Sequence, residues 1–281
     1  MRLVRFGAPG REEPGLWREG RTVALRRLFP DIPDIGETFF REGWLERVRA
    51  VADPGEAREM RLGPPVARPS KIVCLGINYA AHGSEGGFKP PERPVIFAKT
   101  PNALNGPFDP IVLPRSSSQV DWEVELAVVI GREGKRIPRE RALDYVAGYT
   151  VMNDVSGREA QFNDPAKQWL RGKSFDTFAP LGPALVTADE LGDPGDLALE
   201  TLVNGVVMQS DRTRNMIFDV PAILAFVSED ITLAPGDIIA TGTPSGVGHF
   251  RTPPIELKPG DTVECCIEKI GAIRNAVVGR E

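Results

Sequence analysis

The stretch Asp121-Trp-Glu-Val-Glu-Leu-Ala-Val-Val-Ile130 decides the fold of this chain. From Glu123 its polar and apolar residues alternate, and then both faces become apolar, which is typical of a strand inside a sheet. The 281 residues include 29 glycines and 26 prolines, so the chain makes many turns and therefore has many strands. We expect a β-rich, mixed α+β fold.

Further elements are expected on both sides of this strand. Apolar segments bounded by turn residues predict strands at 71–76, 94–99, 145–151, 238–241 and 262–267. A short helical turn is expected at 78–85. A helix is expected at 219–227, where Asp219 is a cap candidate and Pro221 lies in the first turn.

The first sixty residues have the pattern of a small separate unit. Strands are expected at 2–6 and 22–25, joined by a turn at 18–21, and a charged amphipathic helix is expected at 38–51. The Pro-rich connection at 61–69 is where we expect a boundary. The predicted division is a small N-terminal domain at 1–65 and a larger domain at 70–281.

Composition narrows the class of protein. With 41% hydrophobic residues, 26% charged residues and a formal net charge of −5, the chain is an ordinary globular one. Without a dense basic run among aromatics, nucleic acid is not an expected partner. Three cysteines form no regular framework and fit a reducing compartment. The sequence shows no apolar signal or membrane span, so we expect a cytoplasmic protein with no membrane partner.

An acidic constellation is the first chemical feature. Glu123 and Glu125 lie two residues apart on the expected strand, so they share a face at a spacing of roughly 6.5–7 Å. Two like charges beside an apolar stripe resist burial unless a cation joins them, and Asp154 ends the next strand as a third carboxylate. Oxygen ligands suit Mg²⁺, Mn²⁺ or Ca²⁺. The alternative is a solvated strand face without a metal.

A histidine and a carboxylate are predicted to meet on one helical turn. His82 and Glu85 are three residues apart, so one helical turn places them side by side. A carboxylate beside an imidazole orients it as a general base. The glycine-rich surroundings are typical of a closing lid. A surface ion pair at a helix end is the alternative.

Other polar groups follow along the chain. Lys173 lies among aromatic residues, where a partly buried cation stabilises an enolate, although a lysine extending out of an apolar patch is an equal alternative. Arg158 and Gln161 follow Asp154 closely enough to reach the same pocket. The loop 241–248 is rich in glycine, and its backbone amides can form an anion site; a simple tight multi-turn is the alternative.

Taken in order, these segments resemble the fumarylacetoacetate hydrolase family from about Lys71 to the C-terminus. The matching stretches are Gly76-x-Asn-Tyr-x-x-His82, Asp121-x-Glu-x-Glu-Leu-Ala-Val-Val-Ile-Gly131, Gly148-Tyr-x-x-x-Asn-Asp154-Val-Ser, Trp169-x-x-x-Lys173-Ser-Phe-Asp, Met216-Ile-Phe and Thr241-Gly-Thr-Pro-x-Gly-Val-Gly248. Many members read Ser-Ala-Arg-Asp where this chain reads Ser156-Gly-Arg-Glu159, so the role of Glu159 stays open.

The resemblance implies a mixed β-sandwich roll and a homodimer. It also implies functional groups, which are a divalent metal site, a water-activating pair and polar substrate contacts. The implied residues are Glu123, Glu125 and Asp154 for the metal; His82 and Glu85 for the pair; and Lys173, Gln161, Arg158, Thr243 and Gly242 for the substrate.

The expected activity is metal-dependent hydrolysis of a carbon–carbon bond in a 2,4-diketo acid, such as an acylpyruvate or a diketo sugar acid, to give a 2-oxo acid such as pyruvate. In this hypothesis the metal acts as a Lewis acid, His82 and Glu85 activate water, and Lys173 helps to hold the enolate. Isomerisation or hydration of a 2-hydroxydienoate, decarboxylation of oxaloacetate and ureidoglycolate lysis use the same chemistry. A non-catalytic metal- or ligand-binding protein is an alternative of another class.

Overall fold

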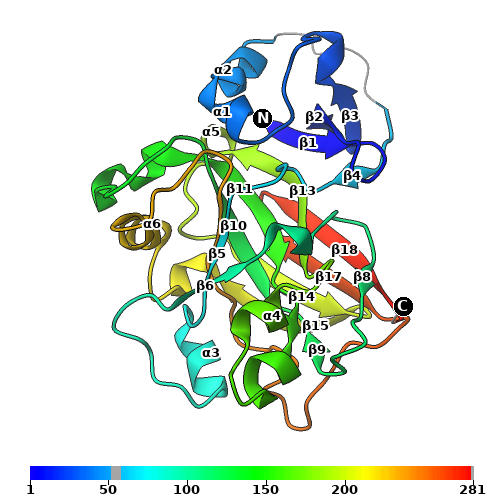
Figure 1. Ribbon diagram of the computed structural model, residues 1–281, viewed down its shortest axis with the longest axis vertical. Coiled ribbons are helices and arrows are strands. Elements are labelled where there is room, and N and C mark those ends of the chain that lie inside the picture. The colour runs from blue at the N-terminus through cyan, green and yellow to red at the C-terminus, as the bar shows by residue number, and fades with distance from the viewer. Residues whose placement is uncertain (52–57, 280–281) are drawn as a thin grey trace.

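Two sheets packed face to face form the body of the molecule in the computed structural model, which describes residues 1–51 and 58–279 (Figure 1). The larger sheet has 11 strands. Its main path runs through β3 (Arg21–Ala24), β2 (Glu13–Arg18), β1 (Arg2–Phe6), β13 (Ala179–Thr187), β11 (Val146–Asn153), β10 (Val124–Ile130), β16 (Ile238–Ala240), β5 (Ile72–Leu75) and β6 (Ile96–Lys99), with β4 (Leu62–Gly63) beside β1 and β7 (Leu104–Asn105) beside β13.

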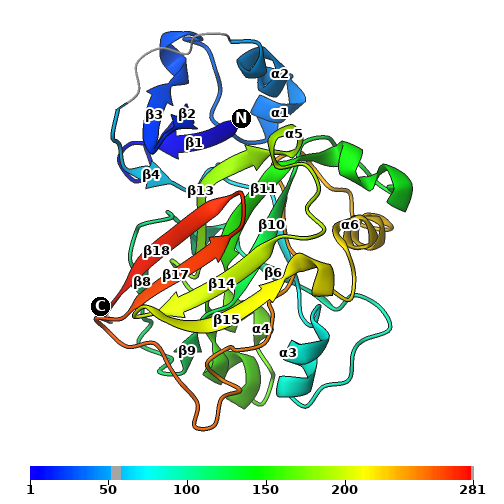
Figure 2. The ribbon, with the colours of Figure 1, turned by 180° about the vertical axis from the view of Figure 1, so that it is seen from behind.

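The second sheet covers one face of the first (Figure 2). Its order is β15 (Val206–Arg212), β14 (Ala198–Val203), β17 (Thr262–Ile267), β18 (Gly271–Val278) and β8 (Ile111–Val112), and a separate short ladder pairs β12 (Ser156–Gly157) with β9 (Val120–Asp121). Antiparallel pairs predominate, but β16 runs parallel to β5. The expected mixed, β-rich sandwich is confirmed.

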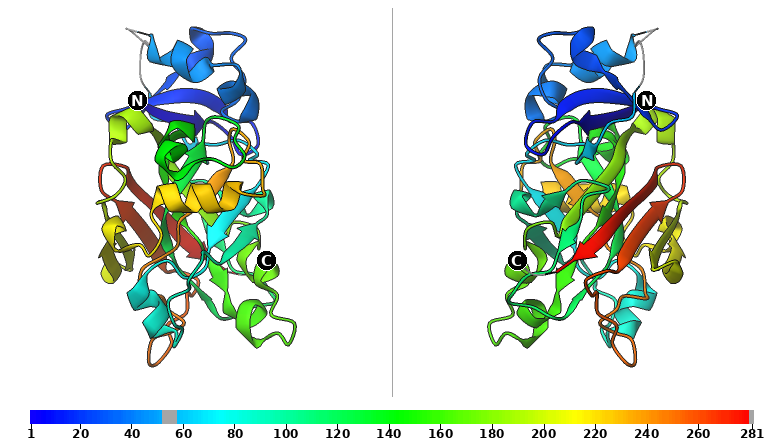
Figure 3. Two further views of the ribbon diagram at one scale, coloured as in Figure 1. Left: turned by 90° about the vertical axis from the view of Figure 1, so that its left-hand side faces the viewer. Right: turned by 90° about the vertical axis from the view of Figure 1, so that its right-hand side faces the viewer.

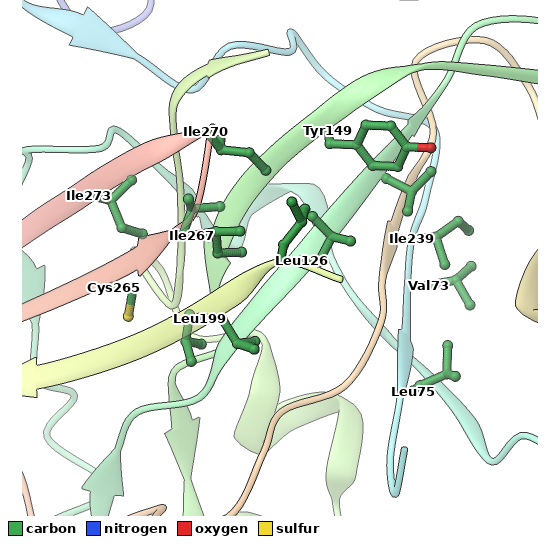
Figure 4. Close-up of a cluster of buried hydrophobic side chains, with 14 of the residues drawn as sticks. Val73, Leu75, Leu126, Tyr149, Leu199, Ile239, Cys265, Ile267, Ile270 and Ile273 are labelled. Carbon is green, nitrogen blue, oxygen red and sulfur yellow. The ribbon is translucent and has the colours of Figure 1, made fainter. Parts of the chain in front are cut away.

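The central strand β10 is buried on both faces, as its sequence predicts. Val124, Leu126 and Val128 belong to the hydrophobic core between the sheets, whereas Ala127 and Val129 belong to a second core on the opposite face. The inter-sheet core joins β10 to strands of the second sheet and is drawn in part in Figure 4. Since β10 contacts both cores, the acidic residues at its start are held rigidly.

Helices are short and lie at the ends and edges of the sheets (Figure 3). They are α1 (Glu37–Arg41), α2 (Trp44–Arg49), α3 (Ala80–Glu85), α4 (Trp169–Lys173), α5 (Ala188–Leu191) and α6 (Val220–Ser228). The expected cap is present on α6, where the Asp219 side chain accepts a hydrogen bond from the backbone N–H of Ala222 at 2.8 Å. Within the described residues, no helix is long and apolar enough to cross a membrane.

Two expectations for the N-terminal region are wrong. The single helix at 38–51 is divided into α1 and α2, because Gly43 between them adopts a left-handed conformation with φ of 73°. The turn at 18–21 joins β2 to β3 instead of joining β1 to β3. Strand β2 was missed because Pro14-Gly15 inside it has the composition of a turn.

The N-terminal region also shares structure with the rest of the chain. Strand β1 pairs with β13, and residues of α1 lie in the same hydrophobic core as Ala127 and Val129. The division at 65–70 therefore stays a prediction, because a shared sheet does not show whether either part folds alone.

Candidate functional site

Three carboxylates meet at the end of two neighbouring strands. Val124 of β10 faces Asn153 of β11, so Glu123 and Asp154 lie beside each other, and the backbone N–H of Asp154 donates to the Glu123 carbonyl at 2.8 Å. One carboxylate oxygen from each of Glu123, Glu125 and Asp154 lies within 4.8 Å of the others. All three side chains are buried. The shared face expected from the sequence is therefore present.

Two buried lysines donate hydrogen bonds to these carboxylates. Lys173, at the end of α4, donates to Glu123 Oε2 at 2.7 Å and to Asp154 Oδ2 at 2.9 Å. Lys99, at the end of β6, donates to Asp154 Oδ1 at 2.6 Å and to the Val155 carbonyl at 3.1 Å. Both oxygens of Asp154 therefore accept from an ammonium group, which fixes the direction of this carboxylate.

An arginine completes the buried ionic group. Arg158 donates through Nε to Asp121 Oδ1 and through Nη2 to Glu123 Oε1, both at 2.6 Å, and through Nη1 to Gln161 Oε1 at 2.8 Å. The backbone N–H of His249 donates to the second Asp121 oxygen at 2.7 Å. Arg158 thus orients the carboxylates and the amide of Gln161 together.

We call this ionic group the carboxylate centre, and it has one more negative than positive side chain. Its members are the carboxylates of Asp121, Glu123, Glu125 and Asp154 and the cations Lys99, Arg158 and Lys173.

Glu125 is the member whose charge is not balanced. Its Oε2 accepts from the Gly242 N–H at 2.8 Å, but its buried Oε1 has no hydrogen-bond partner. Burial, followed by the charges of Asp154 and Glu123, raises the pKa of Glu125 well above its usual value. By contrast, Lys173 and Arg158 outweigh the effect of burial on Glu123 and lower its pKa to about 2.

A divalent cation fits this arrangement. The orphaned Glu125 oxygen, one carboxylate more than the cations can pair, and an all-oxygen donor set are what a hard ion requires. The three residues predicted as ligands are therefore suitably placed to hold a metal.

The predicted histidine–carboxylate pair lies on α3. His82 Nδ1 is 3.4 Å from Glu85 Oε2, and both Glu85 oxygens lie 3.0 Å from the backbone N–H of Gly246. The charge of His82 is a further influence that lowers the pKa of Glu123, after Lys173 and Arg158. The Phe250 ring lies 5.7 Å from the His82 ring, centroid to centroid.

The glycine loop, residues 241–248, follows β16 and contacts both groups. Its amides at Gly242 and Gly246 donate to Glu125 and Glu85. Gly242 has φ of 92°, and a Cβ added there would come within 2.7 Å of the Asn78 Cβ, so this position requires glycine. Thr243 Oγ1 accepts a hydrogen bond from Gln209 Nε2 at 2.8 Å. Helices α3 and α4 and this part of the chain lie at the end of the molecule away from the N-terminal strands (Figures 1 and 2).

A model of the C-terminal domain of fumarylacetoacetate (FAA) hydrolase matches residues 71–278. The chain belongs to the fumarylacetoacetate hydrolase family. The resemblance seen in the ordered motifs is confirmed by this match.

Relatives with this fold have several named activities. The mitochondrial oxaloacetate tautomerase Fahd2a of Rattus norvegicus is 47% identical to this chain and covers 99% of it, with 92% of the relative covered. Fumarylacetoacetate hydrolase of Exiguobacterium antarcticum has 38% identity, a TM-score of 0.84 and full coverage of both chains. Maleylpyruvate hydrolase of Sphingobium sp. SYK-6, in complex with manganese(II) and pyruvate, has 32% identity, a TM-score of 0.83 and full coverage of both chains.

The family member described here departs from the usual motif at Glu159, which lies outside the carboxylate centre. Glu159 begins the π-helical turn Glu159–Asn163, and its carboxylate accepts hydrogen bonds from the Ser118 N–H at 2.8 Å and the Ser118 hydroxyl at 2.9 Å. Its role here is to tie this turn to the preceding loop.

The structure adds three residues to those singled out from the sequence: Lys99, Asp121 and Gln209. Asp121 lies within a matching motif, but no role followed from that position. Lys99 ends a four-residue strand that is too short to show which face is buried. Gln209 gave no signal in the sequence, because a glutamine in the polar segment Gln209–Arg212 is typical of an exposed strand, and only the structure shows that it is the buried residue of β15.

Proposed function

We propose that this chain is a divalent-metal-dependent enzyme that interconverts the enol and keto forms of a 2-oxo acid, with oxaloacetate as the first substrate to test. The observation that carries the proposal is the carboxylate centre, in which Glu125 has an orphaned, buried oxygen beside two further carboxylates. The choice of oxaloacetate is supported by the 47% identity to a relative named for that reaction.

In this proposal Glu123, Glu125 and Asp154 hold Mg²⁺ or Mn²⁺, with Ca²⁺ as a further option. When bound, the ion supplies Lewis-acid polarisation of the 2-oxo group and offsets enolate charge. Its two positive charges convert the centre's excess of one negative charge into an excess of one positive charge. Such a centre attracts a carboxylate-bearing substrate.

The chain's own groups then bind and orient the substrate. We assign the Thr243 hydroxyl of the glycine loop to its carboxylate, since the neighbouring Gly242 N–H already donates to Glu125. Gln161 has its Oε1 occupied by Arg158, which leaves its N–H groups as donors to a ligand. Arg158 acts mainly by holding Glu123 and Gln161 in place, since its bonds already join them. Lys173 supplies a buried positive charge near the developing enolate.

His82 is the group that we assign to proton transfer. Its Nδ1 faces Glu85, which fixes the tautomer with the proton on Nδ1 and leaves Nε2 as the base. Tautomerisation removes a proton from the enol hydroxyl and adds a proton at C3. The C2=C3 double bond becomes a C2=O double bond at the same time, so bonds and protons balance and the reaction needs no co-reactant.

The test is a metal-dependent assay of tautomerisation. The chain is stripped of metal with a chelator, reloaded with Mg²⁺ or Mn²⁺, and mixed with the enol form of oxaloacetate, whose ultraviolet absorbance is followed. We expect faster loss of the enol only with metal. The proposal would be contradicted if the protein accelerated neither this reaction nor any reaction in a panel of 2-oxo and 2,4-diketo acids.

Hydrolysis of a 2,4-diketo acid is the second candidate, and the His82–Glu85 pair favours it. A paired imidazole near the carboxylates is suited to activating a water. His82→Ala should lower turnover on the best hydrolytic substrate by about 10²–10⁴-fold, the usual contribution of positioned acid–base catalysis. Metal affinity, measured by calorimetry, should stay unchanged. Normal turnover by this variant would exclude water activation by His82.

The assembly and the location of the protein also stay predictions. The family resemblance predicts a homodimer, so light scattering should give about twice the chain mass of 30.6 kDa. A monomer would contradict this. The cytoplasmic address is likewise a proposal, and the rat relative is named as mitochondrial.

A further inference from the structure

Gln209 is a buried amide that joins three parts of the site. It lies on the edge strand β15, where Val206 is 59% exposed and Gln209 only 1%. Its Oε1 accepts from the Val124 N–H at 3.1 Å and the Thr201 hydroxyl at 2.8 Å. Its Nε2 donates to Thr243 Oγ1 and to the Pro244 carbonyl, both at 2.8 Å. Gln209 therefore links the strand of the metal ligands to the glycine loop.

The orientation of this amide is fixed by two backbone groups. The Val124 N–H can only donate, so the atom that faces it must be the amide oxygen. The Pro244 carbonyl can only accept, so the atom that faces it must be the amide nitrogen. A flipped amide would lose both bonds, and Thr243 therefore faces an N–H donor.

This orientation determines what the Thr243 hydroxyl can do. A hydroxyl has one hydrogen to donate, and Thr243 uses its oxygen as the acceptor towards Gln209. In the part of the chain that the structure describes, this is the only side-chain hydrogen bond of Thr243. Thr243 is 1% exposed and follows Gly242, whose amide donates to Glu125. Its hydrogen is therefore left for a ligand at the carboxylate centre.

The backbone around Gln209 keeps the strand and the glycine loop at a fixed separation. A Cβ added to Gly246 would come within 2.1 Å of the Met208 carbonyl oxygen, so the loop passes directly against β15. Arg251 Nη2 donates to the Met208 carbonyl at 2.6 Å and to the Gly246 carbonyl at 3.2 Å. The distance from Gln209 to Thr243 is thus determined by packing on both sides.

We propose that Gln209 is a positioning residue that directs the hydroxyl hydrogen of Thr243 towards the carboxylate of a 2-oxo acid bound at the centre. The inference rests on the proposed function, because it takes the ligand to be such an acid. The hydrogen bond from Thr243 then reaches a charged acceptor, the stronger kind of hydrogen bond. Without Gln209, the hydroxyl can turn and donate to the Pro244 carbonyl.

The test measures binding of oxalate, a stable dicarboxylate mimic of a 2-oxo acid, to the Mn²⁺-loaded protein by calorimetry. Thr243→Val should weaken binding by about tenfold or more, the loss of one hydrogen bond to a charged group. Gln209→Met should weaken it in the same direction by at least about threefold. The double variant should bind as Thr243→Val alone does, because both changes remove the same hydrogen bond.

Controls separate positioning from folding. Thr201→Val removes a bond to the other side of the same amide and should leave oxalate binding unchanged. Thermal unfolding of each variant checks that it is folded. If Gln209→Met does not fold, Gln209→Glu keeps an acceptor towards Val124 and Thr201 and replaces the N–H donor with a carboxylate oxygen, to which the Thr243 hydroxyl would donate, so it should also weaken oxalate binding.

The outcomes distinguish this inference from the proposed function. If the wild-type protein binds oxalate only with Mn²⁺, the centre is a metal-dependent acid site. If Gln209→Met then binds oxalate as tightly as the wild type, the positioning role is wrong. The same holds if the double variant loses more oxalate affinity than Thr243→Val alone. In either case the assignment of a metal-dependent acid site is unaffected. No metal-dependent oxalate binding by the wild type would overturn both.

Discussion

Two groups of charged side chains in this molecule have the same charge imbalance in different surroundings. The first is the carboxylate centre, with four carboxylates and three cations. The second, which we call the N-terminal cluster, has three carboxylates and two cations: Glu12, Asp34, Asp109, Arg5 and Arg61. Each has one carboxylate more than its cations can balance.

Exposure separates the two groups. The Asp34 side chain is 36% exposed and the Asp109 side chain 23%, so water solvates the surplus charge of the N-terminal cluster. In the carboxylate centre, the Asp154 side chain is 0% exposed and Glu125 has an oxygen with no partner. The count of charged groups therefore does not identify a metal site; a surplus carboxylate that water cannot reach does.

A cavity lies beside the N-terminal cluster. A cavity of about 810 Å³ is lined in part by Arg5, Asp34 and Arg61 of the N-terminal cluster. Its ionic groups bond to one another and to backbone carbonyls, for example Arg5 to Asp34 and Pro64. A cavity lined by ionic groups that satisfy one another therefore does not mark the chemistry, whereas an unsatisfied polar group does.

The largest difference between the two groups is expected on removal of one carboxylate charge. Glu125→Gln should weaken Mg²⁺ or Mn²⁺ binding by more than about a hundredfold, because even hydrogen-bond partners of metal ligands contribute roughly 10–100-fold. The melting temperature of the metal-free protein should not fall, since Gln resembles the protonated form of Glu125 that burial favours. Asp34→Asn is the matched control, and calorimetry should show unchanged metal binding. Equal losses of metal affinity in Glu125→Gln and Asp34→Asn would contradict the distinction between the two groups.

A smaller effect is expected from pH. Because burial raises the pKa of Glu125 above its ordinary 4.5, the folded metal-free protein keeps a proton that the unfolded chain loses. This stabilising contribution is complete below the unfolded pKa and is lost as the pH rises through the folded pKa. An ion must displace that proton, so metal affinity should rise by up to about tenfold per pH unit.

The measurement for this prediction is the melting temperature with and without Mg²⁺ between about pH 5 and pH 8. The gap between the two curves should widen as the pH rises. A gap that stays constant or narrows would show that Glu125 does not titrate with metal binding.

Disruption of the N-terminal cluster should affect stability alone. Arg5→Ala removes bonds to Asp34, Glu12 and the Pro64 carbonyl, and we expect a loss of about 1–3 kcal/mol in the free energy of unfolding, reduced by the partial exposure of Asp34. Urea denaturation measures this loss. Metal affinity should be that of the wild type, and a change in it would mean that the two groups are coupled.

The smallest effect is expected at Glu159, a carboxylate next to Arg158 in sequence but outside the carboxylate centre. Glu159→Asp, which restores the usual family residue, should shift the free energy of unfolding by less than about 1 kcal/mol, because it disturbs only polar contacts with Ser118 and its neighbours in the loop at 117–119. Turnover should match that of the wild type. A tenfold change in turnover would place Glu159 in the catalytic machinery.

Local sequence pattern was enough to predict much of the fold and part of the site. Alternation in β10 predicted that Glu123 and Glu125 share a face, and helical spacing predicted that His82 lies beside Glu85. These are relations between residues two or three positions apart, where backbone geometry determines proximity.

Relations across long stretches of chain were not predictable in the same way. Lys99 and Asp154 are 55 residues apart, and Gln209 and Thr243 are 34 apart, so only the folded sheets bring them together. Residue type does not reveal a buried lysine, since lysine is almost always exposed unless it is paired. The divided helix at Gly43 was missed because its apolar pattern continues across the glycine.

The most direct test of the central claim is a crystal structure of the protein grown with Mn²⁺, with an anomalous difference map to locate the ion. The account predicts one strong peak per chain, bonded to an oxygen of each of Glu123, Glu125 and Asp154, with Glu125 Oε1 no longer without a partner. A map with no peak at these carboxylates, or with the ion bound instead at the N-terminal cluster, would contradict the account.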